Sequence, residues 1–131
     1  MNFTTRFHQV RYAETDQMRF VHHSNYVKYF EMARIEWLDA LGVSYAQMER
    51  EGLLMPVVYV AMTFKKPLHF GDSFKVKVSL KKPPLATLEF DYAITNQAEE
   101  EICSGSTVLA FITAEKNKSV RCPKIILDQF T

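Results

Sequence analysis

The chain has 131 residues, of which 47% are apolar and 24% charged, and its formal net charge is +1. This length and composition favour one globular domain over residues 1–131, and so small a net charge creates no field that would attract nucleic acid. No segment approaches the ~20 apolar residues of a membrane span, and Met1–Arg6 lacks the apolar run of a signal peptide, so we expect a cytoplasmic protein.

The first predicted elements are an extended segment, Phe3–Tyr12, and a polar turn that leads into a helix near Asn25. The turn carries one acid, Asp16, and two imidazoles, His22 and His23. A helix start presents backbone N–H groups that have no partner within the helix, and these attract negative charge. A carboxylate aimed at a carbonyl that such donors hold is an arrangement suited to acyl transfer.

These side chains also have structural interpretations. Asp16 could form a turn by accepting hydrogen bonds from its own backbone. His22 and His23 could be solvated turn residues, or one of them could be a hydrogen-bonded core residue. Asn25 is a good N-cap residue for the helix that follows.

The helix is predicted over Asn25–Leu41, and Gly42 fits the position that ends a helix. It is apolar nearly all round, which is typical of a buried helix. Its polar residues form one narrow strip: Lys28, Glu31, Glu36 and Asp39. Arg34 falls on the apolar side, and we expect it to meet a buried carboxylate or carbonyl groups, because an unpaired buried charge is costly.

A second, shorter helix is predicted from the capping-box pattern Ser44-x-x-Gln47 to about Glu51. The rest is predicted to be β-structure. The expected strands are Leu54–Phe64, with Pro56 favouring an edge position at its start, then Phe74–Leu80, Leu88–Ile94 and Ile102–Ala114, followed by a polar, basic tail from Glu115. Strands with one apolar face form a sheet that is wet on one side, so we predict an α+β fold with an antiparallel sheet curled around the long helix.

The two cysteines, Cys103 and Cys122, are expected to be free thiols. The sequence contains no Cys-x-x-Cys and no His/Cys cluster at metal-ligand spacing, so we predict no metal site.

The turn and helix resemble the 4-hydroxybenzoyl-CoA thioesterase family, specifically its small bacterial acyl-CoA thioesterase branch. The residues that match the family signature are Gln9, Val10, Thr15, Asp16, Val21, Asn25 and Tyr26. The helix residues Glu31, Arg34, Glu36 and Trp37, and the loop Lys66-Pro67-Leu68-x-x-Gly71-Asp72, are also similar. Two positions depart from the family: its glycine after Asp-x-x is Arg19 here, and the next aliphatic residue is Phe20.

The resemblance implies a hotdog fold, with a five-stranded antiparallel sheet around one buried helix, and hydrolysis of acyl-CoA or acyl-carrier-protein thioesters. It implies that Asp16 is the nucleophile or general base and that a backbone amide near His23 is the oxyanion donor. We rank a direct role of the His23 side chain below that of the amide. The predicted substrate-binding residues are His22, Asn25, Tyr26, Val60 and Thr63. No cofactor is implied, since coenzyme A is part of the substrate.

The resemblance also implies homodimers in which the strand Leu54–Phe64 pairs with its copy, and such dimers often associate into tetramers. The active site would then lie between protomers, with part of the acyl pocket, Val60–Phe64, coming from the second chain. Several loop and strand-end cations, among them Lys65 and Lys66, are either a solvated rim or contacts for the phosphates of coenzyme A.

Two other functions remain open at this point. One is an acyl-thioester hydratase or dehydratase, which needs a histidine paired with a carboxylate near the helix. His69-Phe70 superficially resembles a dehydratase motif, but it is followed by Gly71-Asp72 and comes after the wrong strand. The other is a non-catalytic acyl-CoA binding protein, in which Arg19 has ended hydrolysis.

Overall fold

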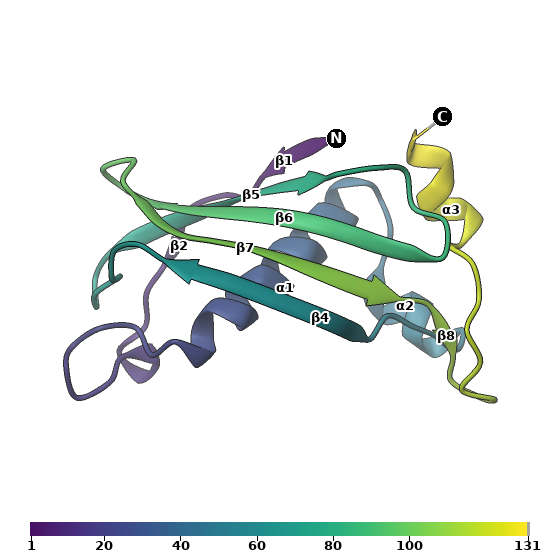
Figure 1. The fold of residues 1–131 in the computed structure, drawn as a ribbon, viewed down its shortest axis with the longest axis horizontal. Helices are drawn as coiled ribbons and strands as arrows, with labels where there is room; N and C mark the ends of the chain where they lie inside the picture. Colours follow the sequence, from purple (N-terminus) through teal and green to yellow (C-terminus); the bar gives the residue numbers. More distant parts are fainter. Residues whose placement is uncertain (131) are drawn as a thin grey trace.

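The computed structural model describes residues 1–130, and its main feature is an antiparallel sheet that curves around one long helix (Figure 1). The helix is α1, Ser24–Ala40. The strands of the sheet run in the order β1-β5-β6-β7-β4, with β2 also paired to β5. Their bounds are β1 Asn2–Thr4, β2 His8–Gln9, β4 Val57–Phe64, β5 Ser73–Leu80, β6 Thr87–Asn96 and β7 Glu101–Ala110. The predicted α+β architecture is therefore confirmed.

Two predicted strands are shorter than expected because the chain leaves the main sheet near their ends. The predicted strand Leu54–Phe64 is split at Pro56, which has no N–H to donate, although its carbonyl still accepts from the Ala110 amide at 3.0 Å. The residues before it form β3, Leu53–Leu54, which pairs with β8, Ile112–Thr113. The predicted last strand Ile102–Ala114 is thus two strands, β7 and β8, in different sheets.

The N-terminal segment Phe3–Tyr12 is extended only in part. β1 and β2 both pair with β5, and between them Thr5 bonds to Val76 through its backbone N–H (2.9 Å) and its hydroxyl (3.0 Å). The chain then turns into a 3₁₀ helix, η1, Tyr12–Glu14. This turn delivers the chain to the Asp16 loop.

The sequence signals predicted the C-terminal end of α1 correctly but not its N-terminal end. Gly42 has a φ of 78° and ends the helix as predicted: its amide donates to the Asp39 carbonyl, and the next amide, of Val43, donates to the Leu38 carbonyl, both at 2.9 Å. This is the Schellman pattern. The prediction of Asn25 as N-cap is wrong, because the helix already begins at Ser24 and the residue before it is His23.

The short helix α2, Tyr45–Arg50, is capped by Ser44, whose hydroxyl accepts from the Gln47 amide at 3.2 Å. The Gln47 side chain bonds Glu51 at 3.0 Å instead of returning to Ser44, so only half of the predicted capping box forms.

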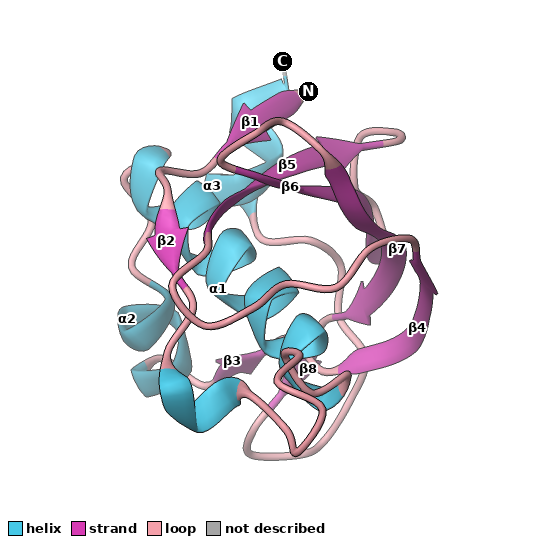
Figure 2. Ribbon diagram, turned by 90° about the vertical axis from the view of Figure 1, so that its left-hand side faces the viewer, coloured by secondary structure: helices cyan, strands magenta, loops and turns pink. Residues whose placement is uncertain are grey.

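One side of α1 packs into the sheet, and the other is more open than the sequence indicates. Phe30 is fully buried and stacks on Tyr92 at 4.2 Å between ring centroids. Figure 2 shows the sheet curving past α1 and ending at β4, whose outer edge pairs with no other strand of the described residues. On the open side Val27 and Ile35 are only half-buried. A single chain therefore does not enclose its helix.

The buried Arg34 finds a partner of a different kind from the one expected. Its Nη1 donates to the Tyr92 hydroxyl at 3.1 Å, and that oxygen lies 2.5 Å from the Thr107 hydroxyl. The expected partner was a carboxylate or a carbonyl. The pairing depends on Tyr92, which is 58 positions away in the chain, and no local pattern indicates it.

The polar, basic tail predicted after Glu115 contains a packed element. A short helix, α3, Lys124–Leu127, buries Ile126 completely and continues into the 3₁₀ helix η2, Asp128–Phe130. Cys103 and Cys122 are both free and buried, as predicted for free thiols. Within the described residues, no helix is both long and apolar enough to span a membrane.

Candidate active site

Asp16 opens a tight loop that places its side chain beside the start of α1. Its amide donates to the Phe20 carbonyl at 2.8 Å, and its carbonyl accepts from the Arg19 amide at 3.0 Å. Arg19 has a φ of 68°, in the left-handed region. This is a three-residue hairpin loop whose last residue is left-handed, a position that favours glycine. The loop therefore explains why the family resembled by this sequence has glycine where this chain has Arg19.

The two oxygens of the Asp16 carboxylate have different surroundings. Oδ1 accepts the amides of Met18 at 2.8 Å and Phe20 at 3.2 Å. In residues 1–130 no protein donor bonds Oδ2. The turn-forming role and an open carboxylate oxygen therefore coexist in one side chain, and the bonds to Oδ1 fix the direction in which Oδ2 points.

The start of α1 leaves one amide free. The amides of Asn25 and Tyr26 donate to the carbonyls of His22 and His23, at 2.9 and 3.2 Å. The Ser24 amide donates to Nδ1 of His22 at 3.2 Å. In the described chain the amide of His23 has no acceptor. It is the one available donor among these positions, and it lies at the positive end of the helix dipole.

The two imidazoles do different things. His22 bonds within the helix start, since its Nδ1 also lies 2.9 Å from the Ser24 hydroxyl. The His23 ring packs against that of His22 at 4.2 Å and lines the cleft described below. His22 therefore caps the helix locally, and His23 is the imidazole that borders the cleft.

A buried network that the sequence did not indicate ties the Asp16 loop to α1. The Glu14 carbonyl accepts from the His22 amide at 2.8 Å and from the Asn25 side chain at 2.9 Å. The Glu14 carboxylate accepts from the Tyr29 hydroxyl at 3.0 Å and from the Arg11 amide at 2.8 Å. Asn25, predicted to contact substrate, is instead buried in this network. In the sequence, only the four-residue spacing of Asn25 and Tyr29 indicated that these two side chains lie on the same face of the helix and could share a partner.

Asp16 and His23 line one cleft of about 400 Å³. Its floor includes Tyr26, which is buried and whose ring meets that of Phe64 edge-on at 5.2 Å. Burial raises the pKa of the Tyr26 phenol above its ordinary value, and the negative charge of Asp16 adds to this shift. The phenol thus stays protonated. Tyr26, a predicted substrate-binding residue, lines the cleft, and so does Phe64 of the same chain, which was expected to contribute to the acyl pocket from the second chain.

A second cleft, of about 480 Å³, lies on another side of Asp16 and includes Arg19, His69 and Phe70. Nδ1 of His69 lies 3.5 Å from the Asp72 carboxylate, and its amide donates to the same oxygen at 2.8 Å. His69 is therefore held by its own loop.

Val60 and Thr63, the other predicted substrate contacts, do not line the Asp16 cleft of their own chain. Val60 is 43% exposed on β4, the free edge strand. Thr63 borders a shallow hollow together with Asp91 and Ser106. Their predicted role requires a second copy of the chain.

The cations near the cleft are paired with carboxylates. Nζ of Lys65 lies 2.7 Å from Glu101, and Lys66 pairs with Glu100. Both lysines line the Asp16 cleft, so they place positive charge at its mouth. Among the described residues no group of histidine, cysteine and acidic side chains could hold a metal ion.

Known proteins are similar to this chain over most of its length. The profile described as the thioesterase-like superfamily matches residues 10–130. YneP of Bacillus subtilis strain 168, provisionally named an acyl-CoA thioesterase, is 34% identical over 123 residues, which cover 94% of this chain and 89% of YneP. The chloroplastic acyl-acyl carrier protein thioesterase ATL3 of Arabidopsis thaliana is 28% identical over 130 residues, covering 96% of this chain and 68% of the plant protein.

Solved structures give the same result. The structure of a DHNA-CoA thioesterase from Staphylococcus aureus matches with a TM-score of 0.90 and 33% identity, over 98% of this chain and 86% of that protein. The hotdog fold expected from the sequence is confirmed by this likeness.

Proposed function

Since the chain belongs to the thioesterase-like superfamily and is a thioesterase, we propose that it hydrolyses acyl-CoA or acyl-carrier-protein thioesters with Asp16 as the catalytic carboxylate and the His23 amide as the oxyanion donor. One observation carries the assignment of these residues. The open Oδ2 of Asp16 and the unpaired N–H of His23 belong to residues that line the same cleft.

The proposed chemistry uses these two groups in sequence. Oδ2 of Asp16 either attacks the thioester carbonyl carbon, giving a mixed anhydride, or takes a proton from a water molecule that attacks instead. The carbonyl oxygen gains negative charge and accepts the hydrogen bond of the His23 amide. The carbon–sulfur bond then breaks, and the thiolate leaves and takes up a proton. After direct attack by Asp16, a water molecule hydrolyses the mixed anhydride to the free acid and the regenerated Asp16 carboxylate. One such donor contributes roughly 2.7–4 kcal/mol to transition-state stabilisation.

A thiol-detecting assay with a panel of acyl-CoA substrates tests the proposal. Asp16→Asn keeps the shape and the Oδ1 hydrogen bonds but removes the basic oxygen, so turnover should be abolished. Asp72→Asn is the matched control, because Asp72 is also a loop carboxylate that accepts a backbone N–H bond, and among the described residues it is not part of the Asp16 cleft lining. Unchanged turnover in Asp16→Asn would exclude the proposed role.

A single turnover in heavy-oxygen water reveals a nucleophilic role of Asp16 when water attacks the aspartyl carbon of the anhydride. If water is activated directly, all of the label enters the released acid. If Asp16 is the nucleophile and water attacks the aspartyl carbon of the anhydride, the label enters Asp16 instead. Mass analysis of the peptide that contains Asp16 distinguishes these results.

We also propose that two copies pair through β4. Within residues 1–130 this strand bonds only to β7, so its other edge presents N–H and C=O groups without a partner strand there. It also exposes a row of large apolar side chains: Val57, Val58, Tyr59, Val60 and Phe64. Light scattering should therefore report a dimer or a multiple of it. Val58→Lys should shift the protein toward the monomer, whereas Leu85→Lys, an equally exposed apolar site away from β4, should not.

A further inference from the structure

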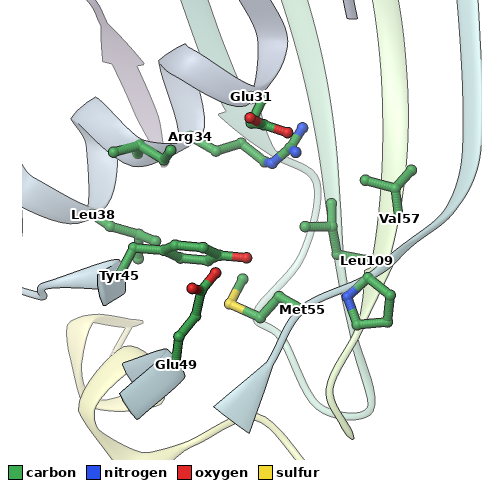
Figure 3. Close-up of a pocket in the computed structure, with 10 residues that line it drawn as sticks. Glu31, Arg34, Leu38, Tyr45, Glu49, Met55, Val57 and Leu109 are labelled. Carbon is green, nitrogen blue, oxygen red and sulfur yellow. The ribbon is translucent and has the colours of Figure 1, made fainter. Parts of the chain in front are cut away.

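A cavity of about 320 Å³, separate from both clefts beside Asp16, lies between the middle of α1, the helix α2 and the start of β4 (Figure 3). Polar groups from four residues converge on it: Arg34 and Glu31 from α1, and Tyr45 and Glu49 from α2. Its other walls are mostly apolar, with Met55 and Leu109 among them.

Arg34 is a buried cation whose hydrogen-bonding capacity is only partly used. It is 7% exposed, and its Nη1 donates to the Tyr92 hydroxyl. A guanidinium has five N–H donors. In the described part of the chain, no carboxylate lies within 4.0 Å of it and no fully buried side-chain nitrogen lacks a partner. The nitrogens without a protein acceptor are therefore open to the cavity, and Figure 3 shows the guanidinium pointing into it.

The opposite wall presents a second polar group, a hydroxyl whose proton is directed to the Glu49 carboxylate. The Tyr45 hydroxyl points into the cavity, with the Glu49 carboxylate close by (Figure 3). Burial raises the pKa of the Tyr45 phenol above its ordinary value, and the charge of Glu49 adds to this shift, so the hydroxyl keeps its proton. With Glu31 the lining has two carboxylates against one guanidinium. This balance disfavours a ligand carboxylate and suits a neutral oxygen that accepts from Arg34.

The position of β4 connects this cavity to the Asp16 cleft of a second copy. Val57, at the start of β4, lines the cavity, and Phe64, at its end, lines the Asp16 cleft. If β4 pairs antiparallel with its copy over its whole length, as proposed above, Val57 lies opposite Phe64 of the second copy. Paired strands are about 4.8 Å apart, so the cavity of one copy adjoins the Asp16 cleft of the other.

We propose that this cavity receives the far end of the acyl group held in the Asp16 cleft of the second copy, and that Arg34 and Tyr45 select acyl groups that end in a neutral hydrogen-bonding oxygen. Hydroxylated or keto acyl groups are then preferred over plain alkyl groups and over carboxylate-terminated ones. This inference rests on the proposed thioesterase function and on the pairing of β4.

The test compares kcat/KM for three medium-chain acyl-CoAs of equal length: plain, terminally hydroxylated and terminally carboxylated. The wild type should prefer the hydroxylated substrate over the plain one about tenfold, as a hydrogen bond to a charged group provides. Arg34→Met should remove that preference, so that the ratio of kcat/KM for the hydroxylated substrate to kcat/KM for the plain one falls to about one. Tyr45→Phe, which does not disturb the core pairing of Arg34, should reduce the preference several-fold.

Tyr92→Phe is the matched control for a purely structural role of Arg34. It removes the hydrogen bond between Arg34 and Tyr92 but leaves the donors that face the cavity. The substrate preference should therefore survive in this variant even though its stability falls. A wild type without preference, or an equal preference in wild type, Arg34→Met and Tyr45→Phe, overturns the inference while leaving the thioesterase proposal intact.

A binding measurement separates the two proposals further. Calorimetry with the Asp16→Asn variant and the same three acyl-CoAs reports affinity without turnover. If the wild type releases no thiol from any substrate, the proposed function fails. A tighter affinity for the hydroxylated compound that Arg34→Met abolishes would still support the cavity assignment, and equal affinities would overturn it.

Discussion

At Gly105 the sheet lies in close contact with Phe30 of α1, and Gly105→Ala tests that packing. A Cβ at this position would lie 2.7 Å from the Ala61 carbonyl oxygen and 2.7 Å from Cε2 and Cζ of Phe30. Carbon atoms in contact are normally about 3.5–4.0 Å apart. The Phe30 ring would therefore have to retreat by roughly 1 Å.

Neither neighbour can move easily. Phe30 is fully buried and stacked on Tyr92, which in turn bonds Arg34 and Thr107. The Ala61 oxygen belongs to the backbone of β4, which is paired along its length with β7. Overpacking of a well-packed core costs about 1–3 kcal/mol, and we expect the upper part of that range here.

Urea unfolding followed by circular dichroism measures the effect. With an m-value of about 1–3 kcal/mol/M, the midpoint should fall by about 1 M at unchanged m. Ser106→Ala is the control, because adjacent strand residues point to opposite faces of the sheet, and it should change little. Phe30→Leu should partly rescue Gly105→Ala, giving a coupling energy of about 1 kcal/mol. A Gly105→Ala variant as stable as the wild type would refute this account of the helix–sheet contact.

Three further predictions concern the loop, the thiols and the response to acid. Arg19→Gly should raise the free energy of unfolding by roughly 0.5–1 kcal/mol, because it removes left-handed strain but adds freedom to the unfolded chain; a less stable variant in urea titration would contradict this. Burial raises the pKa of Cys103 and of Cys122 to about 11. Iodoacetamide at pH 8 should therefore modify both thiols only as fast as the protein unfolds. Rapid modification of the native protein, detected by mass spectrometry, would refute this prediction. Desolvation by itself would raise the pKa of the Asp72 carboxyl group. Interactions with the His69 amide, the Gln97 side chain and the His69 ring outweigh it and hold this pKa below its ordinary value. The stability it contributes is therefore complete above about pH 4, the usual unfolded value, and is lost as the pH falls through the lower folded value; urea midpoints at neutral and acid pH should differ less in Asp72→Asn than in the wild type, and an equal difference would count against this role.

Much of the fold could be predicted because its signals are local. The alternation in β5 and β6 gives one buried and one mostly half-buried face, as the pattern of apolar residues predicted. Gly42 ends α1 because a left-handed residue is needed there. The predictions failed where tertiary contacts intervene: α1 starts before Asn25, because His22 and Glu14 bind the groups at its start.

The candidate active site also combines features that local signals predict with features that depend on tertiary contacts. Asp16 and the helix start were identified from their neighbouring positions and from the family resemblance. The contribution of Phe64 to the cleft and the network of Glu14, Asn25 and Tyr29 depend on segments distant in sequence.

The sequence by itself determined the class of fold, the family and the loop acid, since helix ends, strand alternation and tight turns are set by interactions a few residues apart. Only the tertiary structure decided which amide at the helix start lacks an acceptor, which oxygen of Asp16 is open, and that Arg34 faces a cavity. These features arise when α1 packs into the sheet and brings distant residues together, and the energy of each such contact depends on both partners.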